Sequence, residues 1–263
     1  MGDVNRTKRY VVGNWKMNTQ LADAIVLGEG IKYGVESLSG VEVVLCPPFV
    51  WLYPLAEMFS QGPTNLSLGA QNMHWEEKGT YTGEISPLML KDLVKYVILG
   101  HSERRYHFNE TDEMINDKVI SALDHNITPI LCIGEWKKSE SGDVEGLTKQ
   151  LKAGLAGLEE AQLKKIIIAY EPVWAISKGD TSGQRAASGE YAGEVVGKIR
   201  SYMEKEYGRA VSENIPILYG GSATADNIKE YMFETEIDGV LAGGASLKID
   251  NFLQVCKAVG EYR

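Results

Sequence analysis

One carboxylate stands where a short apolar run ends. Residues 166–169 are aliphatic, which is typical of a strand buried on both faces. Tyr170 and Glu171 come next, and Pro172 follows Glu171. Proline has no N–H and a fixed φ, so the strand is expected to stop there. Trp174 and Ile176 follow in a segment that is unusually apolar for an exposed loop. A carboxylate under such a cover suits a general base, and a solvated strand-end glutamate is the plain alternative.

A histidine and a lysine follow two other apolar runs. His101 comes just after residues 96–99 and is followed by Ser102 and Glu103, which are suited to the start of a helix. A helix N-terminus disfavours the imidazolium, and a neutral imidazole can donate an N–H to a carbonyl oxygen. Asn14 and Lys16 follow the first run, residues 10–13. Taken singly, these three side chains also fit a core histidine, a turn asparagine and a solvated lysine.

Glycine pairs follow the last two runs. Gly220 and Gly221 precede Ser222, and Gly243 and Gly244 precede a segment that is able to open a helical turn. Bare backbone N–H groups at such turns, together with a helix N-terminus, make a site for a phosphate dianion. One pair by itself is more simply a tight turn. Two pairs after adjacent strands favour phosphate, and Lys16 would add a full positive charge.

Eight apolar runs alternate with helical patterns along the chain. The runs cover residues 10–13, 41–46, 66–70, 96–99, 127–133, 166–169, 215–219 and 239–242. This alternation predicts parallel strands with right-handed crossovers, and eight strands close a barrel. We therefore expect an α/β protein with one (β/α)8 TIM-barrel domain over residues 1–263, eight parallel strands and outer helices. An open doubly wound sheet is the alternative, weakened by the lack of a GxGxxG motif after an early strand.

Composition excludes several classes of function. The chain has 27 basic and 36 acidic residues, a net charge of −9, so a nucleic-acid surface is not expected and any anion site must be local. The four histidines lack metal-ligand spacing, and we expect neither a metal nor a cofactor. The three cysteines are far apart, which favours a reducing compartment and hence the cytoplasm. No apolar run is long enough to span a membrane.

Six motifs, in order along the chain, resemble those of the triosephosphate isomerase family. They are Gly13-Asn14-Trp15-Lys16-Met17-Asn18, Leu99-Gly100-His101-Ser102-Glu103-Arg104-Arg105, Cys132-Ile133-Gly134-Glu135, Ala169-Tyr170-Glu171-Pro172-Val173-Trp174-Ala175-Ile176, Tyr219-Gly220-Gly221-Ser222 and Gly243-Gly244-Ala245-Ser246-Leu247. The resemblance runs from about Tyr10 to the C-terminus.

The resemblance implies a glycolytic and gluconeogenic isomerase that interconverts dihydroxyacetone phosphate and D-glyceraldehyde 3-phosphate through an enediolate. It implies that Glu171 is the base that moves a proton between C1 and C2, and that a neutral His101 faces the two oxygens. Lys16 would bind the anionic substrate, Asn14 would help to fix the oxygens, and Glu103 would hold Lys16.

The resemblance also implies a phosphate site and a lid. Main-chain N–H groups of four residues would bind phosphate: Ser177, Ser222, Gly243 and Gly244. Residues 172–182 would form the lid, with Tyr219 and Ser222 as its closed latch and with Glu135 holding Trp174 when it is open. Ser177 and Asp180 stand where the family usually has glycine and lysine, a difference expected to affect lid closure and affinity rather than the reaction.

The resemblance further implies a homodimer. The loop from Gln71 to Ser86 is long for a βα connection. It would insert into the neighbouring subunit, with Thr82 reaching towards Asn14 and Lys16 there. Two other functions remain as contrasts: a Schiff-base aldolase with Lys16 as its nucleophile, and a barrel that binds phosphate without catalysis.

Overall fold

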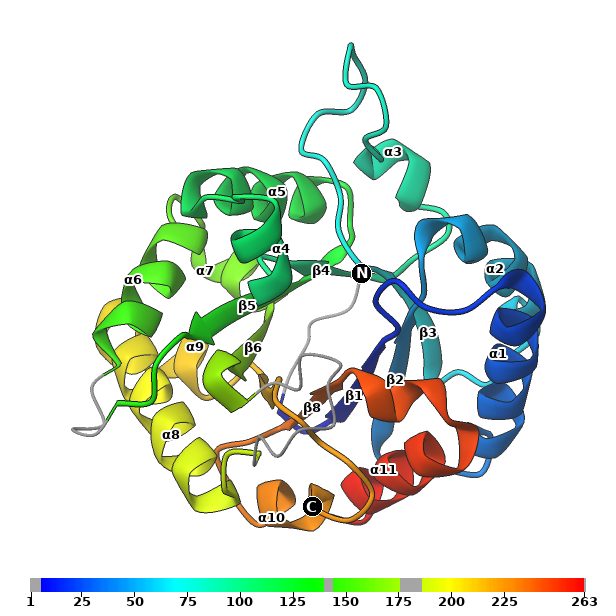
Figure 1. Ribbon diagram of the computed structural model, residues 1–263. Helices are drawn as coiled ribbons and strands as arrows, with labels where there is room; N and C mark the ends of the chain where they lie inside the picture. Colours follow the sequence, from blue (N-terminus) through cyan, green and yellow to red (C-terminus); the bar gives the residue numbers. More distant parts are fainter. Residues whose placement is uncertain (1–5, 140–143, 176–185, 263) are drawn as a thin grey trace.

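Eight parallel strands close into a barrel in the computed structural model, which describes residues 6–139, 144–175 and 186–262 (Figure 1). Each strand pairs with the next along the chain, and β8 pairs back with β1, with Val11 opposite Val240. The strands are β1 (Arg9–Asn14), β2 (Val41–Cys46), β3 (Leu66–Ala70), β4 (Tyr96–Leu99), β5 (Thr128–Glu135), β6 (Ile167–Pro172), β7 (Ile217–Tyr219) and β8 (Gly239–Ala242). The predicted (β/α)8 fold is confirmed, and the open sheet is wrong because β1 and β8 leave no free edge.

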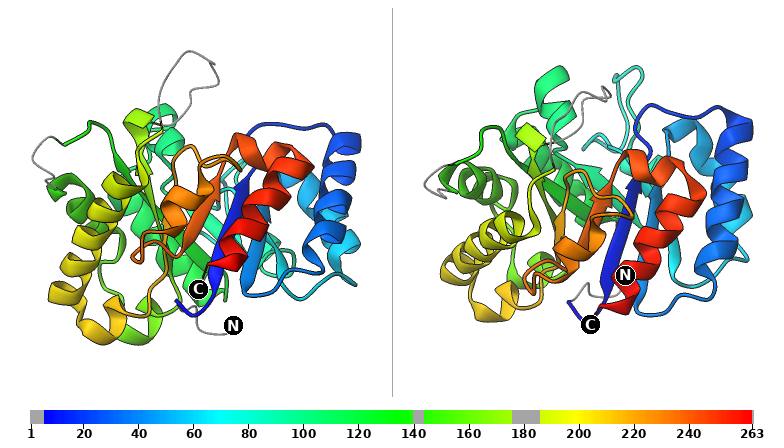
Figure 2. Two further views of the ribbon diagram at one scale, coloured as in Figure 1. Left: turned by 90° about the horizontal axis from the view of Figure 1, so that it is seen from below. Right: turned by 60° about the horizontal axis from the view of Figure 1, so that its bottom comes forward.

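Helices surround the barrel and leave its two ends open to loops (Figures 1 and 2). They are α1 (Leu21–Val35), α2 (Leu52–Phe59), α3 (Pro87–Leu90), α4 (Ser102–His107), α5 (Asp112–Asp124), α6 (Glu145–Gly154), α7 (Glu160–Leu163), α8 (Gly189–Tyr207), α9 (Arg209–Ser212), α10 (Ile228–Met232) and α11 (Ile249–Glu261). Short 3-10 turns lie at Phe49–Trp51 (η1), Val173–Ala175 (η2) and Gly244–Leu247 (η3). No helix in the described part of the chain has the length and apolar character needed to cross a bilayer.

The apolar core has two layers because successive side chains of a strand point to opposite faces. In β1, Tyr10 and Val12 belong to the cluster inside the barrel, whereas Val11 belongs to the larger cluster between the strands and the helices. Both faces of every strand are therefore covered, which explains why the strands are nearly continuous apolar runs. Rigid strands of this kind fix the positions of the residues at their ends.

A buried ion-pair cluster closes the N-terminal end of the barrel. Asp238, which precedes β8, is almost fully buried. Its Oδ1 accepts a hydrogen bond from Arg6 at 2.8 Å and lies 3.4 Å from Arg9, and its Oδ2 accepts one from Arg200 at 3.0 Å and one from the N–H of Ile217 at 2.9 Å. This end joins the first strand to the last two and to α8.

Candidate active site

The carboxyl ends of the strands bring the predicted acid, base and glycine residues to one rim of the barrel. A cavity of about 280 Å³ opens there, and its walls come from the segments that follow β1, β4, β7 and β8. It is lined by Lys16, His101, Gly220, Gly221, Ser222, Ala223, Thr224, Leu241, Gly243, Gly244, Ala245, Lys248 and Asn251. In this class of barrel, chemistry is carried out at this rim.

Glu171 lies under the cavity wall rather than in it. Its side chain is fully buried at the end of β6, with Oε1 3.0 Å from Nε2 of His101, and Oε2 accepts a hydrogen bond of 2.8 Å from the N–H of Ser102. A Cβ on Gly220 would lie only 3.0 Å from Cγ of Glu171. Gly220 therefore leaves room for the Glu171 side chain, which a Cβ at this position would crowd.

His101 is held in one orientation by its own helix end. It is the N-cap residue of α4, and its Nδ1 accepts a hydrogen bond of 3.2 Å from the N–H of Glu103. A nitrogen that accepts carries no proton, so the neutral ring keeps its proton on Nε2, the atom that faces Glu171. The helix end thus selects the tautomer, and Nε2 is the donor.

The pKa of His101 moves in the direction opposite to that expected from a helix N-terminus alone. Burial lowers the pKa of this ring, but the carboxylate of Glu171 raises it, and the net direction is upwards. The shift depends on Glu171 remaining in contact. Among the remaining influences on this pKa, burial and the nearby charge of Lys16 favour the neutral imidazole, whereas Glu103 favours the charged form.

Lys16 sits in a strained backbone conformation at the mouth of the barrel. Its φ is +52°, in the left-handed region that non-glycine residues rarely adopt. Its N–H donates to Oδ1 of Asn14 at 3.0 Å, and its Nζ donates to Oε1 of Glu103 at 2.6 Å. Burial raises the pKa of Glu103, but the Lys16 ammonium outweighs this and the net pKa is lowered. The structure therefore joins Asn14, Lys16, Glu103 and His101 in one connected group.

Gln71 fastens this strained turn, and the sequence interpretation did not single it out. Its side-chain amide donates to the carbonyl of Lys16 and to the carbonyl of Cys46, both at 2.9 Å. The sequence contained only a weak signal, a polar residue directly after β3. Backbone strain near functional residues persists only where surrounding contacts fix it, and Gln71 supplies two of them.

The glycine segments after β7 and β8 face the same cavity. A Cβ on Gly221 would lie 2.2 Å from the hydroxyl of Tyr219, so only glycine fits there. A Cβ on Gly243 would lie 3.3 Å from Cε of Lys16, which places the lysine side chain beside this backbone. Gly244 begins the η3 turn and is exposed, and Ser222 donates through Oγ to the carbonyl of Ala175 at 3.3 Å.

Glu135 collects donors from three neighbouring elements. Tyr170 and Trp174 donate to its Oε2, both at 2.7 Å, and Tyr191 of α8 donates to its Oε1 at 2.6 Å. The N–H of Ser139 also donates to Oε1, at 3.1 Å. The carboxylate thereby connects the segment after Glu171 to the helix that follows. Tyr191 was not predicted as part of the site.

Two further predicted residues lie away from the cavity. Tyr219 is buried and stacks on Tyr231, with ring centroids 3.9 Å apart, and Tyr231 donates to the carbonyl of Ala187 at 2.8 Å. Thr82 is exposed on the long loop that projects beside α3 in Figure 1. Ser177 and Asp180, and the predicted lid beyond Ala175, lie outside the described residues.

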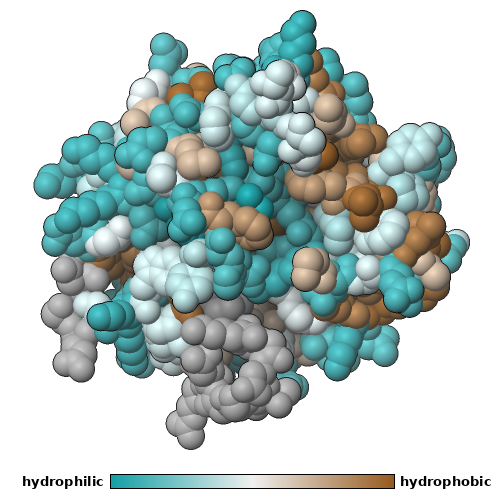
Figure 3. Space-filling model, turned by 45° about the horizontal axis from the view of Figure 1, so that its top comes forward, coloured by the Kyte–Doolittle hydropathy of each residue, from teal (hydrophilic) through white to brown (hydrophobic). Residues whose placement is uncertain are grey.

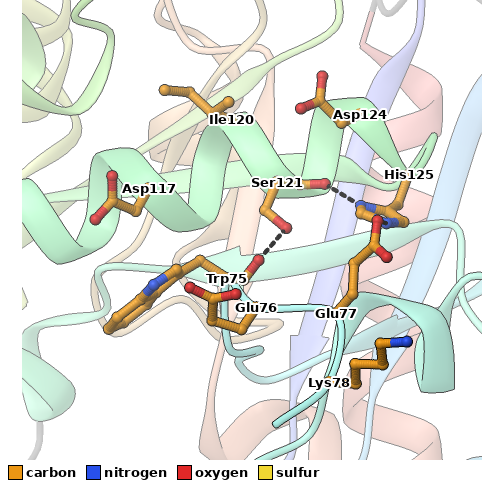
Figure 4. A pocket seen from close by; sticks show the side chains of 9 residues that line it. All are labelled: Trp75, Glu76, Glu77, Lys78, Asp117, Ile120, Ser121, Asp124 and His125. Atoms are coloured by element: carbon orange, nitrogen blue, oxygen red, sulfur yellow. Dashed lines mark hydrogen bonds and ion pairs between the residues drawn. The ribbon is translucent and has the colours of Figure 1, made fainter.

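A second depression, of about 550 Å³, lies between the base of that loop and α5 (Figure 4). Ser121 of α5 donates to the carbonyl of Trp75, and His125 lies 3.2 Å from Glu77, so the contacts fasten the loop to the helix. Its walls include four carboxylates: Glu76, Glu77, Asp117 and Asp124. Such walls repel an anion, whereas the lining of the rim cavity contains no carboxylate. The rim is therefore the better candidate for an anionic substrate.

Fold and site together define an α/β-barrel protein with acid–base residues and bare backbone around a small cavity at the carboxyl ends of its strands. Comparison with known proteins gives the family. The family model described as Triosephosphate isomerase matches residues 9–259. The chain therefore belongs to the triosephosphate isomerase family.

Individual relatives agree with this assignment. Proteins named Triosephosphate isomerase from Dehalococcoides mccartyi, Dictyoglomus thermophilum and Alkaliphilus oremlandii are 46%, 47% and 48% identical to the chain over 249, 257 and 251 residues. These alignments cover 94%, 95% and 94% of this chain and 94%, 99% and 98% of the three relatives. The similarity thus extends over the barrel and its rim.

Proposed function

We propose that the protein interconverts dihydroxyacetone phosphate and D-glyceraldehyde 3-phosphate. The observation that carries this proposal is the contact between the buried Glu171 and the Nε2 of His101 beside a cavity that holds Lys16 and two glycine segments. The reaction needs a base that removes a proton from carbon next to a carbonyl and returns it to the adjacent carbon. It also needs a hydrogen-bond donor for the two substrate oxygens and groups that bind the phosphate.

Glu171 is the proposed base. Its carboxylate turns from Ser102 and His101 into the space left by Gly220 and takes the proton from one carbon of the substrate. The enediolate forms, the hydroxyl proton passes from one substrate oxygen to the other, and the same carboxyl group returns the first proton to the neighbouring carbon. A fully buried position keeps bulk water away from that proton.

His101 and Lys16 are the proposed electrophiles. The Nε2–H of His101, released from Glu171, donates to the oxygen that becomes negative, and Nδ1 stays held by the N–H of Glu103. The ammonium of Lys16 stabilises the developing charge and is positioned by Glu103 and by its own strained turn. Asn14 orients this turn through the N–H of Lys16 and helps to fix the substrate oxygens.

The phosphate is proposed to bind at the glycine segments, where the main-chain N–H groups of Ser222, Gly243 and Gly244 are its donors. The glycine backbones at the cavity and the adjacent Lys16 support this assignment. Ser177 is proposed as a further N–H donor from the lid. Tyr219 and Ser222 are proposed to latch that lid when it is closed, and Glu135 to hold Trp174 when it is open.

We propose a homodimer in which the loop from Gln71 to Ser86 enters the partner subunit and Thr82 reaches its site. Exposed large apolar side chains occur on this loop (Tyr81), on the elements before and after it (Val50, Tyr53, Leu88 and Met89), and at Met17 after β1. Figure 3 shows apolar residues gathering on the right of the molecule, the side on which α1 to α3 lie in Figure 1. A patch of this kind is typical of an interface.

Thr82→Arg would place a bulky cation at the loop and is expected to yield monomers by sedimentation, whereas an unchanged dimer would contradict the proposal.

One domain over residues 1–263 and a cytoplasmic location complete the proposal. The barrel elements run from Arg9 to Glu261, which supports one domain. All three cysteines are free and buried, which supports a reducing compartment.

A coupled assay on the purified protein tests the reaction. Glu171→Gln keeps the shape of the side chain and removes the base, so turnover is expected to fall by about 10²- to 10⁴-fold. Full activity of this variant would overturn the assignment of the base. Borohydride treatment in the presence of substrate distinguishes the aldolase from the isomerase, because only the aldolase would leave a covalent adduct on Lys16. A protein that binds triose phosphate but does not turn it over would be the non-catalytic barrel.

A further inference from the structure

Lys248 lines the rim cavity, although nothing in the sequence motifs assigns it to the site. It lies between η3 and α11 and is the N-cap residue of that helix. Its carbonyl accepts a hydrogen bond of 2.9 Å from Phe252 in the first turn of α11, and its N–H lies 3.4 Å from the carbonyl of Ala245. The backbone of Lys248 is therefore fixed with respect to the glycine segment that begins at Gly243.

The charges around the cavity single this lysine out. Lys16 and Lys248 are the cations among the described lining residues, and the lining contains no Asp or Glu. Lys16 is held by Glu103 at 2.6 Å, so a carboxylate offsets much of its charge. Lys248 forms no ion pair with a carboxylate in the described part of the chain. In a protein with a net charge of −9, this ammonium places a local positive charge at the cavity, where anions would otherwise be repelled by the overall field.

Lys248 also borders a neighbouring groove, in which its ammonium group has a second place to lie. This groove, of about 650 Å³, lies between α1 and α11, and its lining includes Asp23 and Asp250. Neither carboxylate forms an ion pair with it. Lys248 is exposed and is not tied to this groove by an ion pair; it also lines the rim cavity, where the glycine backbones cannot supply a full charge.

We propose that Lys248 is a binding residue for the dianionic phosphate end of the substrate. This inference rests on the proposed function and adds a second cation to the phosphate site. The ammonium attracts a phosphate monoester dianion into the cavity and lowers its dissociation rate, and it takes no part in proton transfer. Its chemistry requires only a dianion, so inorganic phosphate should compete for the same position.

The test measures binding and turnover separately. Calorimetric titration with inorganic phosphate and steady-state kinetics with triose phosphate are run at low and high ionic strength on the wild type, Lys248→Gln, Lys248→Arg and Lys257→Gln. Lys257 lies on the same helix α11, is exposed and is not part of the cavity, so its variant matches the change in net charge. Thermal melting confirms that each variant is folded.

The expected result is a loss confined to Lys248→Gln. Its phosphate affinity and its kcat/KM should each fall about tenfold at low ionic strength and about twofold at high ionic strength, with kcat preserved. Lys248→Arg should retain most of the wild-type affinity, and Lys257→Gln should match the wild type. Equal phosphate affinity in Lys248→Gln and Lys257→Gln would overturn the inference, as would a loss of kcat with affinity preserved. If the wild type bound phosphate through Lys248 yet lacked isomerase activity, only the proposed function would fail.

Discussion

Two buried carboxylates lie at opposite ends of the barrel, and they differ in how many cations surround them. Asp238 contacts Arg6, Arg9 and Arg200 at the N-terminal end. Glu171, at the C-terminal rim, contacts the imidazole of His101 and one N–H, and no Lys or Arg within the described residues. Both side chains are 1% exposed or less.

The difference in partners suits Asp238 to stabilising the fold and Glu171 to the proposed role of a base. A buried carboxylate that is saturated by guanidinium groups cannot move without exposing several buried charges, so Asp238 is fixed. Glu171 has only two partners, His101 and the N–H of Ser102. The ring of His101 would keep its orientation without the carboxylate, because its Nδ1 accepts a hydrogen bond from the N–H of Glu103. A carboxylate with few partners is free to exchange them for a substrate. The same fold therefore holds one buried carboxylate with three arginines and leaves the other, the proposed base, with two weaker partners.

The largest effect on stability is expected at the N-terminal end. Asp238→Asn removes the charge that three arginines share; it leaves Arg9 without a carboxylate partner and Arg6 and Arg200 with Glu236 alone, which should lower the free energy of unfolding by about 3–5 kcal/mol. Denaturant unfolding measures this, with the exposed Asp92→Asn as control. The folded fraction should keep its kcat. An unchanged unfolding midpoint would show that the arginines are satisfied by other groups.

A smaller effect is expected from the residue that fastens the rim. Gln71→Ala removes two hydrogen bonds from carbonyl groups at the turn of Lys16, which should cost about 1–2 kcal/mol of unfolding free energy. Because the turn is strained, kcat/KM should also fall by about tenfold as Lys16 loses its position. Denaturation and the coupled assay measure both quantities. A loss of stability with kcat/KM unchanged would reduce Gln71 to a structural role.

The contact at the rim also predicts a pH effect. In Glu171→Gln the pKa of His101 should fall, because the carboxylate that raises it is gone and burial, which lowers it, remains. Nuclear magnetic resonance of the labelled imidazole measures the change. The raised pKa in the wild type means that this contact adds stability at low pH, and that the contribution is lost as pH rises through the folded-state pKa of His101. A variant whose imidazole titrates as in the wild type would show that Glu171 does not set this pKa.

The smallest effect on stability is expected from that same variant. Glu171→Gln replaces a poorly paired buried charge with a neutral amide of the same shape, so its free energy of unfolding should change by less than about 1 kcal/mol. Set beside Asp238→Asn in one denaturation series, it tests the comparison directly. A large loss in Glu171→Gln would mean that this carboxylate also fastens the fold.

Local patterns in the sequence were sufficient for the barrel and for much of the rim. The apolar runs predicted the strands because a strand buried on both faces excludes polar residues, and the eight strands follow the predicted runs closely. Parallel strands bring their carboxyl ends together, so Glu171, His101 and the glycine pairs could be placed at one rim from their positions after the runs. The family motifs then suggested a role for each.

The tertiary structure decided the contacts between residues that are distant in the sequence. Gln71 reaches the turn of Lys16, 55 residues earlier, and Arg6 reaches Asp238 across 232 residues. No periodicity predicts such pairs, because each residue on its own is an ordinary polar side chain. The upward shift in the pKa of His101 arises in the same way, since the helix end acts locally while the carboxylate arrives from another strand.

What the sequence by itself determined is thus the order of the elements and the chemistry available at each strand end, because both depend on neighbouring residues. Only closure of the barrel decided that Asp238 is surrounded by cations and that Glu171 is not. Closure surrounds Asp238 with arginines from three segments of the chain and gives Glu171 a single imidazole and one N–H. Charge acts through space, and only the fold sets the distances.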